Sequence, residues 1–423
     1  MSKHYLTCRI LRCSVHRNLV ALDSRLFMAS SVLSPNPVVP RRVLGFASVM
    51  HIWSDLFFAL LVPLLPAIKD DLGLSYFQIG LLRSVFTGAT AIFQIPVGIL
   101  AETTGEFWLL LLGNAWVALG VIAMALCTVF PVLLLVAFFG GLGGGTQHPL
   151  GSSMVSRAYD ERGVSKAVGT VNFAGDLGKM LAPAFALIAV PFGWRATFLA
   201  AGLSALVFLI FTTPFKKSVD IGRPVPISKD SVVSDGSETN MSGFITLSGI
   251  GVLDSATRAS ALVFLPFVMH AKGMEPVQIS IMLFILFGGG AVGKYVVGWL
   301  GAKFSAVSLI WATKGITAVL LLLSLIAPPL ALIPLLAIMG IGLNGTSSAL
   351  YASVASLVPL HRRARLYGFF YTTNEIGTVL APLVYGFIAD IFNLEFTVVV
   401  MGLATLVILP ASLALRKHVG YLN

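Results

Sequence analysis

The chain has 423 residues, of which 57% are hydrophobic and 11% are charged, and it carries a formal net charge of +10. Soluble domains average roughly 45–50% apolar and about 25% charged residues, so a soluble protein of this composition would lack the polar side chains to cover its surface. The composition argues against a soluble enzyme, a disordered chain and a nucleic-acid-binding module, and it indicates an integral membrane protein.

The first 43 residues are rich in Arg and Ser and contain a single acid, Asp23. This pattern is typical of a transit peptide, but it fits a basic cytoplasmic tail better, and Met28 is an alternative start. We therefore expect residues 1–43 to precede the membrane domain as a basic cytoplasmic tail.

Twelve later stretches are long and apolar enough for transmembrane helices, which need about 20 mostly apolar residues. They are 44–68, 76–101, 107–127, 129–156, 166–191, 195–214, 243–270, 276–301, 305–326, 329–358, 366–391 and 395–415. Residues 215–242 are rich in Ser, Asp, Pro and Gly and lack apolar periodicity, which is typical of a linker. We predict an all-α membrane protein with six-helix bundles at 44–214 and 243–415 and a short C-terminal segment at 416–423.

Lys and Arg residues outside the predicted spans are distributed unequally between the two sides of the membrane. Twenty lie on the side of both chain ends and the linker, and three lie on the opposite side. Because cytoplasmic segments carry such an excess, we expect both termini and the linker in the cytoplasm. The membrane that we expect for this chain is the inner membrane of a bacterial cell. The positive charge would also attract anionic membrane lipid, so it does not require nucleic acid as a partner.

The two predicted bundles match each other at an offset of 200 residues. Identical residues occupy ten of the 36 positions from 65 to 100, including Gly73 and Gly273. Near the end of each half the offset becomes 199, where Asp176 and Glu375 begin similar segments. We interpret this match as a duplicated six-helix unit whose copies start on the same side. Transporters built from parallel repeats bind their substrate near the midplane, between the two halves. One half rocks on the other, so that the site opens to each side of the membrane in turn.

A glycine-bounded segment lies between the second and third predicted helices. The sequence Gly98-Ile-Leu-Ala-Glu102-Thr-Thr-Gly105 resembles the gating loop of the major facilitator superfamily, with Glu102 in place of the usual Asp. With the six-plus-six helices and the central linker, residues 44–415 are similar to that superfamily. The resemblance implies a secondary transporter. The chain departs from the family pattern at Glu106-Phe107, where the family has basic residues.

Two shorter segments resemble the fosmidomycin-resistance-like branch of that superfamily. One is Gly141–Ser152, which contains Gln147-His148-Pro149, and the other is Asn172–Gly178. This resemblance implies a proton-driven exporter of small, often anionic, compounds. The family's antiporter segment on the fifth helix usually has Gly-Pro followed by paired glycines, whereas this chain has Ala182-Pro183-Ala, which favours uptake over export.

Four acids fall near the middle of predicted spans: Asp55, Asp176, Asp254 and Glu375. At about 1.5 Å per residue each lies roughly 15 Å from the membrane surface, near the centre of a ~30 Å hydrocarbon core. Because ionisable groups at that depth are costly unless they are paired or hydrated, we expect this layer to border a wet passage between the bundles.

Helical spacing predicts three local charge pairs in this layer: Asp254 with Arg258, His51 with Asp55, and Asp176 with Lys179. One interpretation is simple neutralisation, which permits insertion into the membrane. The other is a binding site, in which Arg258 binds an anionic group of the solute and Asp254 orients it.

Proton coupling needs a carboxyl group whose protonation changes with the conformation of the cavity. Asp55, Asp176 and Glu375 are the candidates, with a preference for the two acids that the repeat keeps, and His51 is a candidate proton relay. Three further residues are candidates for solute binding: Arg83, His148 and Asn344. For Arg83 and His148 a purely structural role is equally consistent with the sequence.

The sequence contains no recognisable enzyme or metal motif, and Cys8 and Cys13 match no zinc or redox spacing. We expect a monomeric transporter that acts on protons and a small-molecule solute without a cofactor or a bound metal. The first hypothesis is proton-coupled efflux of an anionic or amphiphilic solute. The alternatives are proton-coupled uptake of a carboxylate, a metal chelate or a sugar-like nutrient, and a non-transporting sensor or scaffold, which Glu106-Phe107 suggests.

Overall fold

The computed structural model describes residues 39–160, 163–222, 240–358 and 363–418. Six spans form the first half: α2 (Pro40–Leu72), α3 (Tyr76–Thr104), α4 (Glu106–Ala125), α5 with α6 (Phe130–Leu142 and Gln147–Ala158), α7 (Val164–Ala189) and α8 (Trp194–Thr212). Six more form the second half: α10 (Met241–Ala271), α11 (Pro276–Leu300), α12 (Ala306–Ile326), α13 (Leu332–Leu357), α14 (Arg363–Ile391) and α15 (Leu394–Leu413). The short helix α9 (Lys216–Val219) follows the first half.

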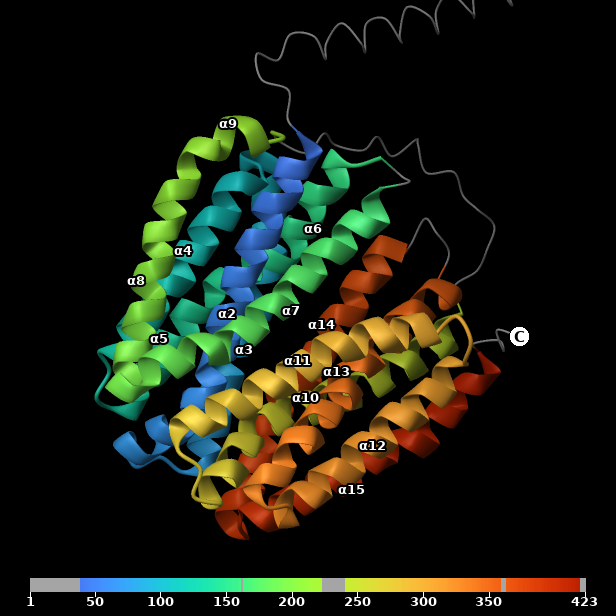
Figure 1. The fold of residues 1–423 in the computed structure, drawn as a ribbon. Helices are drawn as coiled ribbons and strands as arrows, with labels where there is room; N and C mark the ends of the chain where they lie inside the picture. Colours follow the sequence, from blue (N-terminus) through green and yellow to red (C-terminus); the bar gives the residue numbers. More distant parts are fainter. Residues whose placement is uncertain (1–38, 161–162, 223–239, 359–362, 419–423) are drawn as a thin grey trace, which may run out of the picture.

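The two halves lie side by side as two helical bundles, coloured blue to green and yellow to red (Figure 1). Ten of the described helical segments are long and apolar enough to cross a membrane. The two remaining spans, α7 and α14, carry Asp176 and Glu375 in their interiors. The predicted all-helical membrane fold is therefore confirmed. The assignment of each half as a separate domain, and of the cytoplasmic side, stays a prediction.

The repeated residues have local structural roles in both halves. Gly73 and Gly273 follow α2 and α10 with φ of 62° and 76°, a conformation that residues with a Cβ rarely adopt. Gln78 and Gln278 occupy the third position of the next helix, where each side chain bonds back to the residue before the helix in a capping box. The same turn is thus built twice, once in each half.

The fourth span differs from the continuous helix predicted for 129–156. A 3-10 turn at Gly143–Thr146 separates α5 from α6. The glycines here lie against neighbouring backbones: a Cβ on Gly140 would be 2.8 Å from the Cα of Gly120, and one on Gly145 would be 2.6 Å from the carbonyl oxygen of Thr90. Close helix packing, which small residues permit, accompanies the change in helical pitch.

The halves pack through α3 against α14, α7 against α11, and α2 against α10. We call the end of the molecule where α2 ends and α3 begins the outer end, following the predicted orientation. There the carboxylate of Asp390 accepts hydrogen bonds of 2.8 Å from the backbone N–H groups of Tyr76 and Phe77. These N–H groups have no partner within α3, so Asp390 caps the first turn of a helix in the other half.

Two further contacts join the halves at and just inside the outer end. The hydroxyl of Ser84 donates to the carbonyl oxygen of Val379 at 2.5 Å, and His270 lies 3.2 Å from Asp70. A hydrophobic cluster that includes residues of both halves, among them Leu61, Phe264 and Leu283, fills this part of the molecule.

Candidate functional site

The four predicted acids all lie near the middle of long helices. Asp55 is on α2, Asp176 on α7, Asp254 on α10 and Glu375 on α14, so each half supplies two. Asp55, Asp176 and Asp254 are buried, and Glu375 is partly exposed. The structure therefore places the acids as expected, while their roles stay predictions.

The acids of the first half share one lysine. The ammonium of Lys179 lies 3.1 Å from Oδ2 of Asp55 and 3.3 Å from Oδ1 of Asp176. The Asp176–Lys179 pair follows from spacing within α7, whereas the contact to Asp55 depends on how α7 packs against α2. One basic side chain thus holds two carboxylates on adjacent helices.

A second lysine connects this group to the other half. Nζ of Lys294, on α11, donates hydrogen bonds of 2.7 and 2.6 Å to the two carboxylate oxygens of Asp176. Local spacing in the sequence does not predict this contact, because the two residues are 118 positions apart. The ion pair lies between α7 and α11, which face each other across the two bundles.

A separate charged group lies inside the second half. Nζ of Lys314, on α12, is 2.5 Å from Oδ1 of Asp254, and both side chains are almost completely buried. Arg258 is farther from the same carboxylate, at 3.7 Å, and its side chain is 24% exposed. The predicted Asp254–Arg258 pair is present, but Lys314 is the closer partner of Asp254, and the guanidinium of Arg258 also donates to Ser255 at 3.2 Å.

Glu375 and Arg83 do not form an ion pair. Arg83 instead donates a 2.6 Å hydrogen bond to the carbonyl oxygen of Phe58 on α2. Oε2 of Glu375 is buried and has no hydrogen-bond partner among the residues that the structure describes. Within that part of the chain Glu375 is the one acid of the four without an ion pair.

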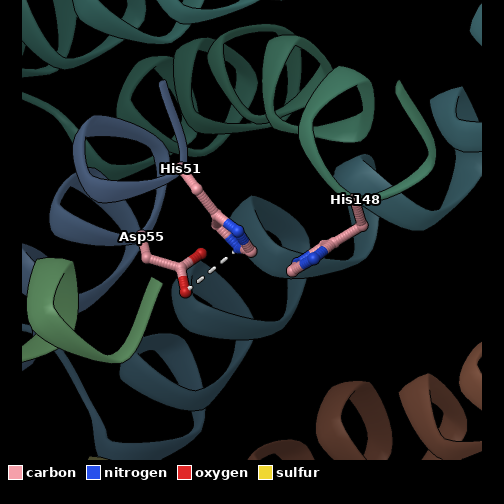
Figure 2. Close-up of side chains that lie close together, drawn as sticks. All are labelled: His51, Asp55 and His148. Atoms are coloured by element: carbon pink, nitrogen blue, oxygen red, sulfur yellow. Dashed lines mark ion pairs between the residues drawn. The ribbon is translucent and has the colours of Figure 1, made fainter. Parts of the chain in front are cut away.

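His51, Asp55 and His148 come together on the first half, with His51 and Asp55 on α2 and His148 on α6 (Figure 2). Nε2 of His51 lies 3.6 Å from Oδ2 of Asp55, and the imidazole rings of His51 and His148 meet edge to face with centroids 5.0 Å apart. One ligand atom from each residue lies within 4.8 Å of the others, so the three could hold a metal ion. The sequence predicts the His51–Asp55 pair but not its association with His148, because no local spacing places His148 beside His51.

Asn344, another residue expected to bind solute, packs against Gly290 between α11 and α13. The backbone carbonyl oxygen of Asn344 accepts a 2.6 Å hydrogen bond from the hydroxyl of Ser347. The structure thus brings Asn344 into a helix contact, and its side chain is only partly exposed.

The segment predicted as a gating loop is mostly helical: residues 98–104 form the last turns of α3, and only Gly105 separates α3 from α4. Gly98 lies in α3 with open space where a Cβ would be, Glu102 is exposed, and Gly105 ends α3 with φ of 79°. Glu106 is buried and receives hydrogen bonds of 2.8 and 2.7 Å from Arg157 at the end of α6. Glu106, which departs from the family pattern, therefore pairs with a basic residue of the same half.

The charges within the spans do not cancel. Away from their ends, the spans carry four acids and five basic side chains; the bases are Arg83, Lys179, Arg258, Lys294 and Lys314. Asp55 and Asp176 balance Lys179 and Lys294, and Asp254 balances Lys314. Arg258, Arg83 and Glu375 remain, which leaves one net positive charge when Glu375 is ionised.

Comparison with known proteins agrees with this architecture. Residues 47–236 and 247–420 match the family model described as Major Facilitator Superfamily. Fosmidomycin resistance protein from Escherichia coli (strain K12) is 26% identical over 371 residues, which cover 84% of this chain and 87% of that protein. A gentisate transporter from Corynebacterium glutamicum is 28% identical over 341 residues, covering 76% of this chain and 74% of the relative.

Solved structures show the same fold. A bacterial homologue of the human lysosomal transporter Spinster superposes with a TM-score of 0.76 at 15% sequence identity. The match covers 89% of this chain and 97% of that chain. The fold and family resemblance predicted from the sequence are thus confirmed.

Proposed function

The chain belongs to the major facilitator superfamily and is a secondary transporter of a small solute in a membrane, and from that premise we propose that it moves a small organic anion coupled to protons. The observation that carries the proposal is the partial exposure of Arg258 beside a carboxylate that Lys314 already neutralises. Arg258 shares this carboxylate with Lys314, so the two bases carry one excess positive charge; an excess charge inside a membrane span costs several kcal/mol, and an anionic solute would compensate it. A guanidinium also binds carboxylate or phosphonate groups through two parallel hydrogen bonds.

Glu375 is the proton site in this proposal. It lies on α14, which packs against α10, the helix that carries Arg258. When Glu375 is ionised it competes with the solute for the positive field of the arginines. When it takes a proton the net charge of the layer rises by one, which favours anion binding. Binding of a proton and binding of an anion would therefore support each other.

Alternating access supplies the movement. The hydrogen bonds of Asp390 and Ser84 join the halves toward the outer end. With the cytoplasmic side placed by the charge distribution, this arrangement corresponds to a state closed to the outside. Rocking the halves would break these contacts and bring the inner ends together, around the Asp176–Lys294 pair.

The relatives favour an organic anion. One is named as a gentisate transporter, and gentisate is a hydroxylated aromatic carboxylate. This class of solute carries one carboxylate, which Arg258 would bind, and an apolar aromatic ring. Efflux remains the first candidate direction, because the fosmidomycin resistance protein, which is named for resistance, aligns with 84% of this chain and the gentisate transporter with 76%.

Uptake by symport is the second candidate, and Ala182-Pro183-Ala on α7 favours it. Mutual support between proton and anion binding also suits symport, because both then travel in the same direction. In bacterial cells the cytoplasmic membrane would be the site of either process.

The proposal is tested in proteoliposomes that contain the purified protein and labelled gentisate as the probe, with and without a pH gradient. We expect accumulation driven by the gradient in wild-type vesicles and none in vesicles with Arg258→Gln. Reversing the gradient separates symport from antiport, because symport moves the anion toward the alkaline side and antiport toward the acidic side. Gentisate binding without exchange would instead indicate a sensor. If gentisate does not bind, a thermal-shift screen of small carboxylates and phosphonates precedes the transport assay.

A further inference from the structure

Two imidazoles and a carboxylate from different helices converge in the first half, apart from Arg258 and Glu375, the residues on which the proposed function depends. His51 and Asp55 come from α2 and His148 from α6, as Figure 2 shows. His51 is only 3% exposed, and its Nε2, which faces Asp55, has no hydrogen-bond partner among the residues that the structure describes. Buried polar groups are normally satisfied, so an unpartnered buried ring nitrogen indicates a missing ligand.

The spacing of the donor atoms suits a transition-metal ion. Two ligands with bonds of about 2.0–2.1 Å at a tetrahedral angle are roughly 3.4 Å apart. His51 Nε2 and Asp55 Oδ2 are 3.6 Å apart, and the third donor lies within 4.8 Å of both. His148 is exposed, so its side chain has the freedom to rotate the remaining distance toward the other two.

The backbone of α7 leaves space beside the two buried donors. A Cβ at Gly175 would lie 2.6 Å from Oδ2 of Asp55 and 2.7 Å from Nε2 of His51. Any side chain at position 175 would therefore occupy the region next to both donor atoms. The glycine keeps this region open.

Lys179 is the group that opposes a bound cation, because it lies 3.1 Å from the same oxygen of Asp55. It also contacts Asp176 at 3.3 Å, so it has a second carboxylate to which it can move. An ion at the histidines would thus replace Lys179 as the partner of Asp55 and leave Lys179 paired with Asp176.

We propose that His51, Asp55 and His148 form a binding site for a divalent transition-metal ion, entered past the exposed His148. Two imidazoles and one carboxylate are ligands typical of Zn²⁺, Co²⁺ and Ni²⁺ rather than of Mg²⁺ or Ca²⁺. Three protein ligands leave a fourth position open, which an anion or a water molecule can fill.

The test uses Co²⁺ alone as the probe, added to purified, tag-free full-length protein in detergent. Co²⁺ in a four-coordinate site has an intense visible absorption, and equilibrium dialysis with elemental analysis gives the stoichiometry. We expect one Co²⁺ per chain, displaced by Zn²⁺, and a loss of affinity of at least about 100-fold in His51→Gln and in His148→Gln. His270→Gln is the matched control, because His270 pairs with Asp70 at the outer end.

A further variant separates a lost ligand from a misfolded protein. Gly175→Ala keeps all three donors but places a methyl group beside two of them, so it should weaken Co²⁺ binding. His148→Gln should retain the wild-type elution volume and melting temperature, which would show that its loss of binding is not caused by misfolding. Equal Co²⁺ binding by the wild type, His51→Gln and His148→Gln would overturn the proposal, as would binding to the wild type that His270→Gln abolishes. Because the assay contains no solute and no gradient, its outcome is independent of the transport test.

Discussion

The ammonium of Lys294 on α11 bonds to both carboxylate oxygens of Asp176 on α7, at 2.7 and 2.6 Å, and so ties the two halves of the transporter together. The two helices face each other across the bundles. Any rocking of one half on the other must either pivot on this ion pair or break it. The pair is therefore a natural place to test coupling between the halves.

A double-mutant cycle on this pair measures that coupling. Asp176→Asn leaves Lys294 without its carboxylate, and Lys294→Met leaves Asp176 to Lys179 alone. We expect each single variant to lower the melting temperature, and the double variant to be no worse than Asp176→Asn, with an interaction energy of about 1–3 kcal/mol. Thermal unfolding of purified protein provides the measurement. Strictly additive effects would show that the two residues act separately.

The buried pair in the second half gives a sharper stability prediction. Asp254→Asn leaves the ammonium of Lys314 buried without a counter-charge, and removing one partner of a buried pair costs about 3–5 kcal/mol. Adding Lys314→Met removes the stranded charge, so the double variant should regain most of the lost stability. The melting temperatures of the two variants and the wild type decide this. A double variant as unstable as Asp254→Asn would mean that Lys314 is not the partner that matters.

The anion site is tested by two substitutions at one position. Arg258→Gln removes the partly exposed cation, and we expect solute affinity to fall at least about 30-fold, the equivalent of about 2 kcal/mol. Arg258→Lys keeps the charge but loses the planar pair of donors, so its affinity should be intermediate. Titration calorimetry with the transported solute gives the constants. An unchanged dissociation constant in Arg258→Gln would remove Arg258 from the solute site.

Asp390 provides a test of the outer closure. Asp390→Asn weakens the cap on the first turn of α3, so the outer ends should separate more often. Spin labels at Leu126 and Leu330, both exposed and near the outer end, would report a longer distance population by electron paramagnetic resonance. Asp71→Asn is the matched control, since Asp71 pairs with Arg195 inside the first half. Equal distance distributions in both variants would exclude Asp390 from the closure.

Much of this architecture follows from local sequence patterns. The length of the apolar stretches predicts the spans. The match between the halves at an offset of 200 residues predicts the paired turns, in which Gly73 and Gly273 both adopt a positive φ. Spacing along one helix likewise predicts the pairs Asp176–Lys179 and His51–Asp55, both of which the structure contains.

Other contacts depend on how helices rotate and pack, which periodicity does not specify. Lys294 and Asp176 are 118 positions apart, and Asp390 caps a helix 314 positions away. The group formed by His51 and His148 was missed for the same reason. The 3-10 turn at Gly143–Thr146 contains three consecutive glycines, and it packs against α3 and α4, a contact that the sequence does not specify.

The account depends most directly on Glu375 as the group that links protons to the solute. The decisive measurement compares Glu375→Gln with the wild type in proteoliposomes, in exchange of labelled solute at equal pH and in accumulation driven by a pH gradient. Because glutamine mimics the protonated acid but cannot release a proton, we predict that Glu375→Gln retains exchange and loses gradient-driven accumulation. Gradient-driven accumulation at the wild-type rate in Glu375→Gln would contradict the account.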